Sequence, residues 1–393
     1  MRLEFLGSVR TLVLGFGSHG GRSLAAFRRL YERIAQVTIA RSSFHARFTE
    51  ELANTLHALL QKSLEAARCT RHLGGALDAF LEVLAIDSSV VRLSPKLSKE
   101  WPGAWPNHSP ATMKVTAVTN VVGRDLRRLT FAPGSRHEVH LLKVGSWLEE
   151  RLLVFDLGFF GAKIFQHIDG QGGYFLSRLK KQSNPFILAS YEDTDGEAVG
   201  FRLKEWQQRT TKKVIDVEGK MTYQDRPLKL RKFSVPFRVV ALWHEPSQTW
   251  HRYITNAPPE MIPAKLCSAI YAARWEIELL FKELKSQYRM EEFRSKSGPI
   301  NLALVFAALL TLLVSRRLHR AVDEALSKRA VPHDRWLRVF SLVAHDLLRI
   351  CSRDRTGTLA RETWFFLKTE APDPNRNRPL LAERSSMGVC AFA

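Results

Sequence analysis

Cysteine is scarce in this chain: among 393 residues there are only four, Cys69, Cys267, Cys351 and Cys390, scattered along the sequence. They form no CxxC pair and combine with no histidines into a zinc-finger pattern. The sequence therefore argues against a disulfide scaffold and against a structural zinc centre. We expect reduced thiols in a cytoplasmic protein.

Long apolar runs are also lacking. The longest, residues 302–314, has 13 residues and includes a threonine, so it is too short to span a bilayer and is typical of a buried helix. Residues 11–16 form a short apolar stretch behind Arg2 and Arg10, which imitates a signal peptide, but no A-x-A cleavage site follows. We expect no contact with a membrane.

Acidic residues are in short supply as well. The chain has 39 Asp and Glu against 59 Lys and Arg, which gives a formal net charge of +20. Such an excess favours a polyanionic partner, nucleic acid ahead of membrane, although it also serves solubility. The length allows two or three domains with a substantial core.

Residues 22–72 read as helical, behind a leader at residues 1–21. Gly15, Gly17 and Gly20 form a GxGxxG pattern, but no second strand with an acid about 20 residues further on follows it, so we expect no dinucleotide site. Apolar residues recur at helical spacing from position 44 to 64. This part, with its several bases, is either a DNA-binding domain or a packing module.

Two apolar stretches that read as strands carry an aspartate toward their ends. Residues 81–90 contain Asp87, and residues 151–158 predict a strand buried on both faces with Asp156 as its only acid. If the two strands pair, they lie about 4.8 Å apart, so both carboxylates can share a hard divalent ion such as Mg²⁺ or Mn²⁺. The alternative is that each aspartate only caps a turn.

Further elements separate and follow these strands. Residues 115–122 and 128–131 predict strands, residues 137–149 a helix, and residues 174–180 a basic strand with Arg178 and Lys180. From there to about residue 263 the chain reads as interrupted β structure, and helices are expected again at 302–314, 318–327 and 334–351.

The stretch from Tyr271 to Lys285 contains no Gly or Pro and predicts a single helix. At about 100° per residue, Tyr271, Arg274, Glu278 and Lys285 fall within one sector roughly 60° wide, beside an apolar sector. One carboxylate in a row with two cations and a phenol suits a site that holds a metal and receives phosphates. The alternative is a solvated face with weak ion pairs.

The order of these elements resembles the ribonuclease-H-like fold of the DDE transposases. Tyr271, Arg274, Glu278 and Lys285 match the Tyr-x2-Arg-x3-Glu-x6-Lys signature of one branch of bacterial insertion-sequence transposases. The segment that begins at Asp156 also resembles that branch. The resemblance covers residues 73–313 and implies a mixed α/β (α+β) fold with a β-rich insertion.

The resemblance implies an enzyme. Asp87, Asp156 and Glu278 would be catalytic and would hold two divalent ions, Mg²⁺ or Mn²⁺, for phosphodiester cleavage and strand transfer. The alternatives are a DNA-binding protein that has lost catalysis and a nuclease with the same core. The enzyme would work in the bacterial cytoplasm, at the nucleoid.

The resemblance also implies DNA contacts. Tyr271, Arg274 and Lys285 would bind phosphates, and Arg178 and Lys180 would line the DNA path unless they form a solvated strand edge. An aromatic residue of the insertion would stack on an extruded base, with core packing as the alternative for each candidate. The candidates are Trp206, Trp243 and Trp250. The partners would be double-stranded DNA, both terminal inverted repeats and target, and a second copy of the chain.

We therefore expect seven parts. They are a leader without stable order (1–21), a helical N-terminal DNA-binding domain (22–72), the first part of the core (73–179), a β-rich insertion (180–264), the second part of the core with the Glu278 helix (265–320), a C-terminal helical region (321–370) and a disordered tail (371–393).

Overall fold

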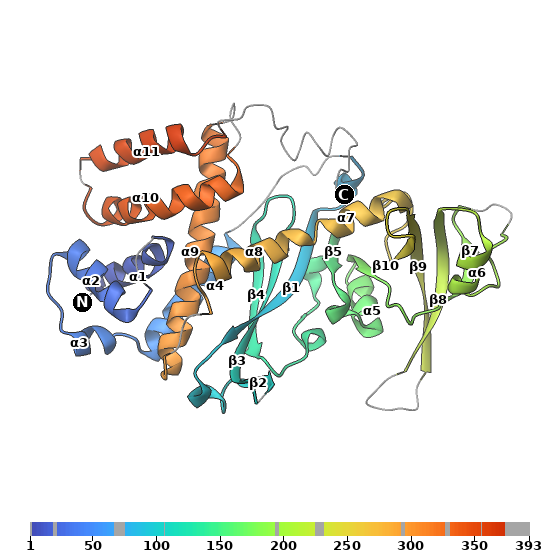
Figure 1. Ribbon diagram of the computed structural model, residues 1–393, viewed down its shortest axis with the longest axis horizontal. Helices are drawn as coiled ribbons and strands as arrows, with labels where there is room; N and C mark the ends of the chain where they lie inside the picture. Colours follow the sequence, from blue (N-terminus) through green and yellow to red (C-terminus); the bar gives the residue numbers. More distant parts are fainter. Residues whose placement is uncertain are drawn as a thin grey trace.

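The structure is a computed structural model that describes residues 2–18, 22–66, 75–105, 107–192, 196–224, 232–291, 295–326, 331–354 and 356–373. Helices α1, α2, α3, α10 and α11 gather at one end of the molecule, and α9 stands between them and a central sheet (Figure 1). Strands β7 to β10 lie at the opposite end. Most of the tail predicted to be disordered lies outside the described residues.

Ten strands in the described chain form one mixed sheet in the order β2-β3-β1-β5-β6-β10-β9-β8-β7, with β4 also paired to β3. Strands β1 and β3 are antiparallel, whereas β1, β5 and β6 run parallel. This arrangement confirms the predicted mixed α/β class with a ribonuclease-H-like core. The strands are β1 (Glu82–Arg92), β2 (Pro102–Trp105), β3 (Ser109–Asn120), β4 (Leu126–Pro133), β5 (Arg151–Phe155), β6 (Tyr174–Arg178), β7 (Phe186–Ser190), β8 (Val214–Gln224), β9 (Lys232–His244) and β10 (Thr249–Thr255).

Successive side chains of a strand point to opposite sides of the sheet, and helices cover both sides of the central strands, so both faces are buried. Ala85 and Val154 belong to the core shared with helices α4, α8 and α9, whereas Ile86 and Phe155 belong to the core under α5. The helices are α1 (Arg2–Gly17), α2 (Leu24–Ala35), α3 (Arg41–His45), α4 (Glu50–Glu65), α5 (Ala162–Gly170), α6 (Leu203–Arg209), α7 (Cys267–Ala272), α8 (Trp275–Ser286), α9 (Gly298–Ala325), α10 (His333–Arg353) and α11 (Thr358–Glu370).

The expectation of a leader without stable order is wrong, because helix α1 occupies it. Phe16 is fully buried, and α1 packs against α9 and α10. The glycines of the GxG pattern permit this packing: a Cβ on Gly17 would lie 2.7 Å from the Phe340 ring, and one on Gly15 would lie 3.0 Å from Leu30. The pattern therefore serves close helix contact.

Two other predicted elements differ. Residues 137–149 form two short 3₁₀ turns, Glu138–His140 and Ser146–Leu148, rather than a helix, and the apolar side chains between them pack on the sheet as a loop. Helix α9 continues where two helices were expected. It is long and apolar enough to cross a membrane, with a mean hydropathy of 2.0 over its most apolar window, but 78% of that window is buried inside the fold. It is the buried helix that the sequence predicted.

The β-rich stretch predicted for residues 180–264 is present, and its strands extend the core sheet. Strand β10 pairs antiparallel with β6, with Tyr253 opposite Arg178. Strands β9, β8 and β7 follow outward in that order. The insertion and the core thus share one continuous sheet.

Candidate active site

The parallel pairing of β1 and β5 brings two aspartates to the same place in the sheet. Ile86 lies opposite Phe155, so Asp87 and Asp156 follow at equivalent positions. Each aspartate accepts a hydrogen bond from the next backbone N–H, at 2.7 Å in both cases. Asp87 differs from expectation in one respect: β1 continues beyond it to Arg92, paired with β3.

Glu278 reaches this place from the helix beside the sheet, but the predicted single helix is wrong. The chain forms α7, a tight turn and then α8, and the turn is closed by bonds from Arg274 N to Tyr271 O and from Ile277 N to Arg274 O, both 3.1 Å. The break lets the two helices aim their side chains separately. Tyr271 donates its hydroxyl to Oδ1 of Asp156 at 3.2 Å, while Arg274 turns to other carboxylates.

Arg274 lies between two of the carboxylates. Its Nη2 donates to Glu278, and its Nη1 lies 3.9 Å from Oδ2 of Asp87. The guanidinium also stands 5.7 Å from the ring centre of Tyr271. A half-buried group of acids is therefore balanced by a cation that the chain itself supplies.

Burial shapes the protonation of this cluster. Burial raises the pKa of Asp87 to about 6, and the nearby carboxylates of Glu138 and Glu278 add to the rise, while the Ser88 N–H and Arg274 oppose it. Burial also raises the pKa of Tyr271 to about 12, with Asp156 as the next cause. Tyr271 thus keeps its proton at every working pH.

The donor set fits a hard divalent ion. Asp87, Asp156 and Glu278 offer only carboxylate oxygens, the ligands that Mg²⁺ and Mn²⁺ prefer. Burial, which raises the pKa of Asp87, disfavours the charged form of this carboxyl, and Arg274 offsets the effect in part. Within the described chain, no three Asp, Glu, His or Cys side chains lie close enough to hold one ion as they stand.

The other predicted DNA-binding side chains have different partners. Arg178, exposed on β6, stands 5.3 Å from the ring centre of Tyr271. Lys180 lies 4.7 Å from the ring centre of Phe160, just beyond the turn after β5. Lys285 is near the far end of α8, where it pairs with Glu291 at 3.0 Å. The structure thus groups Tyr271, Arg274 and Arg178 and leaves Lys285 apart.

Two residues beside the carboxylates were not predicted from the sequence. Glu138 follows β4 and accepts a hydrogen bond from Ser88 Oγ. Trp275, at the start of α8, is 58% exposed although it is a large aromatic residue. Its position between Arg274 and Glu276 in a charged run was the available signal. The three tryptophans named above are less open: Trp206 is 9% exposed, and Trp243 and Trp250 pack edge-on with ring centres 5.5 Å apart.

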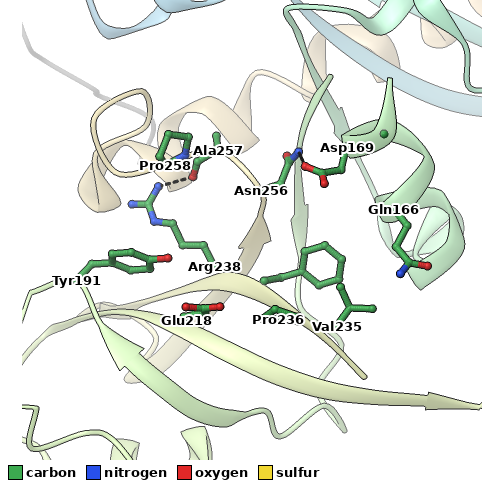
Figure 2. A pocket seen from close by; sticks show the side chains of 12 residues that line it. Gln166, Asp169, Tyr191, Glu218, Val235, Pro236, Arg238, Asn256, Ala257 and Pro258 are labelled. Atoms are coloured by element: carbon green, nitrogen blue, oxygen red, sulfur yellow. Dashed lines mark hydrogen bonds between the residues drawn. The ribbon is translucent and has the colours of Figure 1, made fainter. Parts of the chain in front are cut away.

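A cavity of about 610 Å³ lies elsewhere, between the insertion and α5, lined among others by Tyr191, Glu218, Arg238 and Asn256 (Figure 2). Figure 2 shows Arg238 donating to the carbonyl of Ala257 and Asn256 donating to Asp169. The guanidinium of Arg238 also forms two bonds with buried Asp216. Arg238 and Asp169 are thus held by hydrogen bonds from or to their neighbours, and the residues that line the cavity include none of the predicted site residues.

The chain also matches a known protein family. The family described as "Transposase DDE domain" matches residues 78–314, more than half of the chain. The chain therefore belongs to the DDE transposase family.

Individual relatives are distant. The chain is 22% identical over 346 residues to a transposase for insertion sequence element IS231F from Bacillus thuringiensis subsp. israelensis, which covers 77% of this chain and 71% of that protein. It is 20% identical over 323 residues to a transposase for insertion sequence element IS1151 from Clostridium perfringens, covering 72% and 67%. Among solved structures, the piggyBac transposase synaptic complex with hairpin DNA matches with a TM-score of 0.48 at 9% identity, over 99% of this chain and 81% of that one.

Proposed function

We propose that this transposase binds the terminal inverted repeats of its own insertion sequence and cuts and joins DNA with two divalent ions held by Asp87, Asp156 and Glu278. The observation that supports it most directly is the parallel pairing of β1 and β5 beside α8. Asp87 and Asp156 stand at equivalent positions there, and Arg274 links Asp87 to Glu278.

The side chains around the carboxylates have distinct tasks in this proposal. Mg²⁺ or Mn²⁺ at such carboxylates supplies Lewis-acid activation of a water or a DNA 3′-hydroxyl and stabilises the leaving oxygen of an in-line displacement. Tyr271 keeps its proton and orients Asp156 through its hydrogen bond. Arg274 binds a phosphate next to the scissile bond, because its planar fork matches two phosphate oxygens.

The approach of DNA is guided by the excess of positive charge. Arg178 and Lys180 would bind DNA where the core passes into the insertion, and Lys285 would bind it separately, near the end of α8. Two element ends must be joined in concert, so we propose a homodimer on paired ends. Light scattering of the protein with two bound end fragments tests that stoichiometry.

The direct test is cleavage of linear DNA that carries the element's terminal repeats, with Mg²⁺ present and absent. Glu278→Gln keeps the shape of the side chain and removes its charge, and exposed Glu362→Gln on α11 is the matched control. We expect the first variant to bind DNA but cut at least about 10³-fold more slowly, and the control to cut normally.

The other outcomes separate the alternatives. Equal cleavage by wild type and Glu278→Gln would contradict the assignment of the acids. Tight binding without cleavage by either protein would favour a DNA-binding protein that has lost catalysis. Cleavage without strand transfer would favour a nuclease with the same core.

A further inference from the structure

Glu138 lies behind the two aspartates, on a 3₁₀ turn between β4 and β5. Its Oε1 accepts the hydroxyl of Ser88, and Lys114 Nζ lies 3.9 Å from the same oxygen. Since Ser88 follows Asp87 in a strand, its side chain points to the opposite face of the sheet. Glu138 therefore contacts strand β1 on the face opposite to the side chain of Asp87.

The same carboxylate also lies against the second aspartate's turn. A Cβ built on Gly158 would stand 2.1 Å from Oε2 of Glu138, far inside contact distance. The backbone of Gly158 lies outside the left-handed region, so its φ would accept an alanine. An alanine at this position would push the Glu138 carboxylate out of the place where it accepts the hydroxyl of Ser88.

The two residues that Glu138 contacts, Ser88 and Gly158, lie at or next to the backbone N–H groups that hold the aspartates. Asp87 is oriented by the N–H of Ser88, and Asp156 by the N–H of Leu157, the residue before Gly158. A displacement of either backbone segment would turn the aspartate bonded to it. The Glu138 carboxylate thus contacts both of the backbone segments that orient Asp87 and Asp156.

We propose that Glu138 is a positioning residue that sets the spacing and orientation of Asp87 and Asp156 through Ser88 and Gly158. The proposal rests on the proposed function, in which these aspartates hold divalent ions. Glu138 itself touches neither the ions nor DNA. Its contribution is rigidity at the rear of the site, comparable to that of the residues that orient metal ligands in other proteins.

The test is a pair of substitutions whose effects cancel. Gly158→Ala forces a methyl group against Glu138, and Glu138→Ala removes the obstacle. We expect Gly158→Ala to weaken Mn²⁺ binding by the full-length protein, measured calorimetrically without DNA, by about 10- to 100-fold. The double variant should recover to the milder level of Glu138→Ala, because the two effects are not additive. Gly161→Ala is the control, since its Cβ would meet nothing nearer than Val139 at 4.0 Å.

Two results would overturn the proposal: a double variant as weak as Gly158→Ala, or a Gly158→Ala variant no different from the Gly161→Ala control. If Gly158→Ala does not fold, Ser88→Ala decides instead, because it only deletes the hydroxyl. We expect it to weaken Mn²⁺ binding about 3- to 10-fold, and unchanged binding would refute the positioning role. Wild-type protein that binds no Mn²⁺, with Asp87→Asn unchanged as well, would refute the proposed function itself.

Discussion

The carboxylate of Glu283 lies 2.9 Å from Nη2 of Arg316 in the interior of the protein, and their side chains are 2% and 9% exposed. The pair joins α8, which carries Glu278, to α9. His333 of α10 lies 3.2 Å from the same carboxylate. Burial alone would raise the pKa of Glu283, but Arg316 and His333 outweigh it and hold that pKa below its usual value.

Removing one member of this pair should cost much stability. Arg316→Met leaves the Glu283 charge buried without its main partner, and we expect the free energy of unfolding to fall by about 3–5 kcal/mol. Denaturant titration measures the loss. Arg209→Gln breaks an exposed pair with Glu205 and should cost less than about 1 kcal/mol. Similar losses for the two variants would contradict the role given to burial.

The raised pKa of Asp87 predicts how stability depends on pH. The folded protein binds this proton more tightly than the unfolded chain, whose carboxyl titrates near 3.8. Ionisation of Asp87 therefore costs stability, and the cost appears as pH rises from about 4 through about 6. Without divalent ions at pH 7.5, Asp87→Asn should be more stable than wild type by about 1–2 kcal/mol, yet it should not cleave DNA.

Thermal melts at several pH values check this prediction. The advantage of Asp87→Asn should shrink as pH falls from 7 to 4, because wild type then becomes neutral at this position too. An advantage of the same size at pH 4 and pH 7.5 would show that the substitution acts by packing. No advantage at pH 7.5 would show that Arg274 already compensates the charge in full.

The hydroxyl of Tyr271 should matter for rate more than for stability. Tyr271→Phe removes one partly buried hydrogen bond to Asp156, which contributes about 0.5–1.5 kcal/mol, so cleavage should slow by about 3- to 10-fold. Because the pKa of Tyr271 is about 12, the wild-type to mutant rate ratio should stay constant between pH 7 and 10. A ratio that changes with pH in that range would show that the phenol takes part in proton transfer.

Trp275 should bind DNA by stacking. Its indole is exposed beside Arg274 on the helix that carries Glu278, and base stacking on such a ring contributes about 1–3 kcal/mol. Trp275→Ala should weaken binding of an end fragment by about 5- to 150-fold, and Trp275→Phe should keep most of the affinity. Trp105→Ala is the control, since Trp105 is 74% exposed but lies on β2. Equal effects at Trp105 and Trp275 would argue against a specific contact.

The sequence predicted the parts of the site that depend on local pattern. Asp87 and Asp156 stand out because each follows an apolar run, and a run of that kind predicts a buried strand whatever its neighbours are. The spacing of Tyr271, Arg274 and Glu278 is likewise visible in the sequence. These residues do meet in the structure.

What the sequence did not predict depends on contacts between distant residues. Glu138 reaches Ser88 across 50 positions, from a turn whose apolar residues imitate a helix. The order of α1 depends on Phe340 and its neighbours, more than 300 residues away, to cover its apolar side. The break at Arg274 falls in a stretch without Gly or Pro, where helix propensity gives no signal for it.

The pairing of β6 with β10 has a mechanical consequence. The outer strands belong to the same sheet as the strands that carry Asp87 and Asp156. The pairing register therefore fixes the position of each outer residue relative to these carboxylates, in steps of roughly 3.3 Å along a strand. A slip of one step between β6 and β10 would turn every outer side chain to the other face. If DNA contacts the outer strands during the proposed reaction, its distance from the carboxylates is set by the backbone geometry of the sheet.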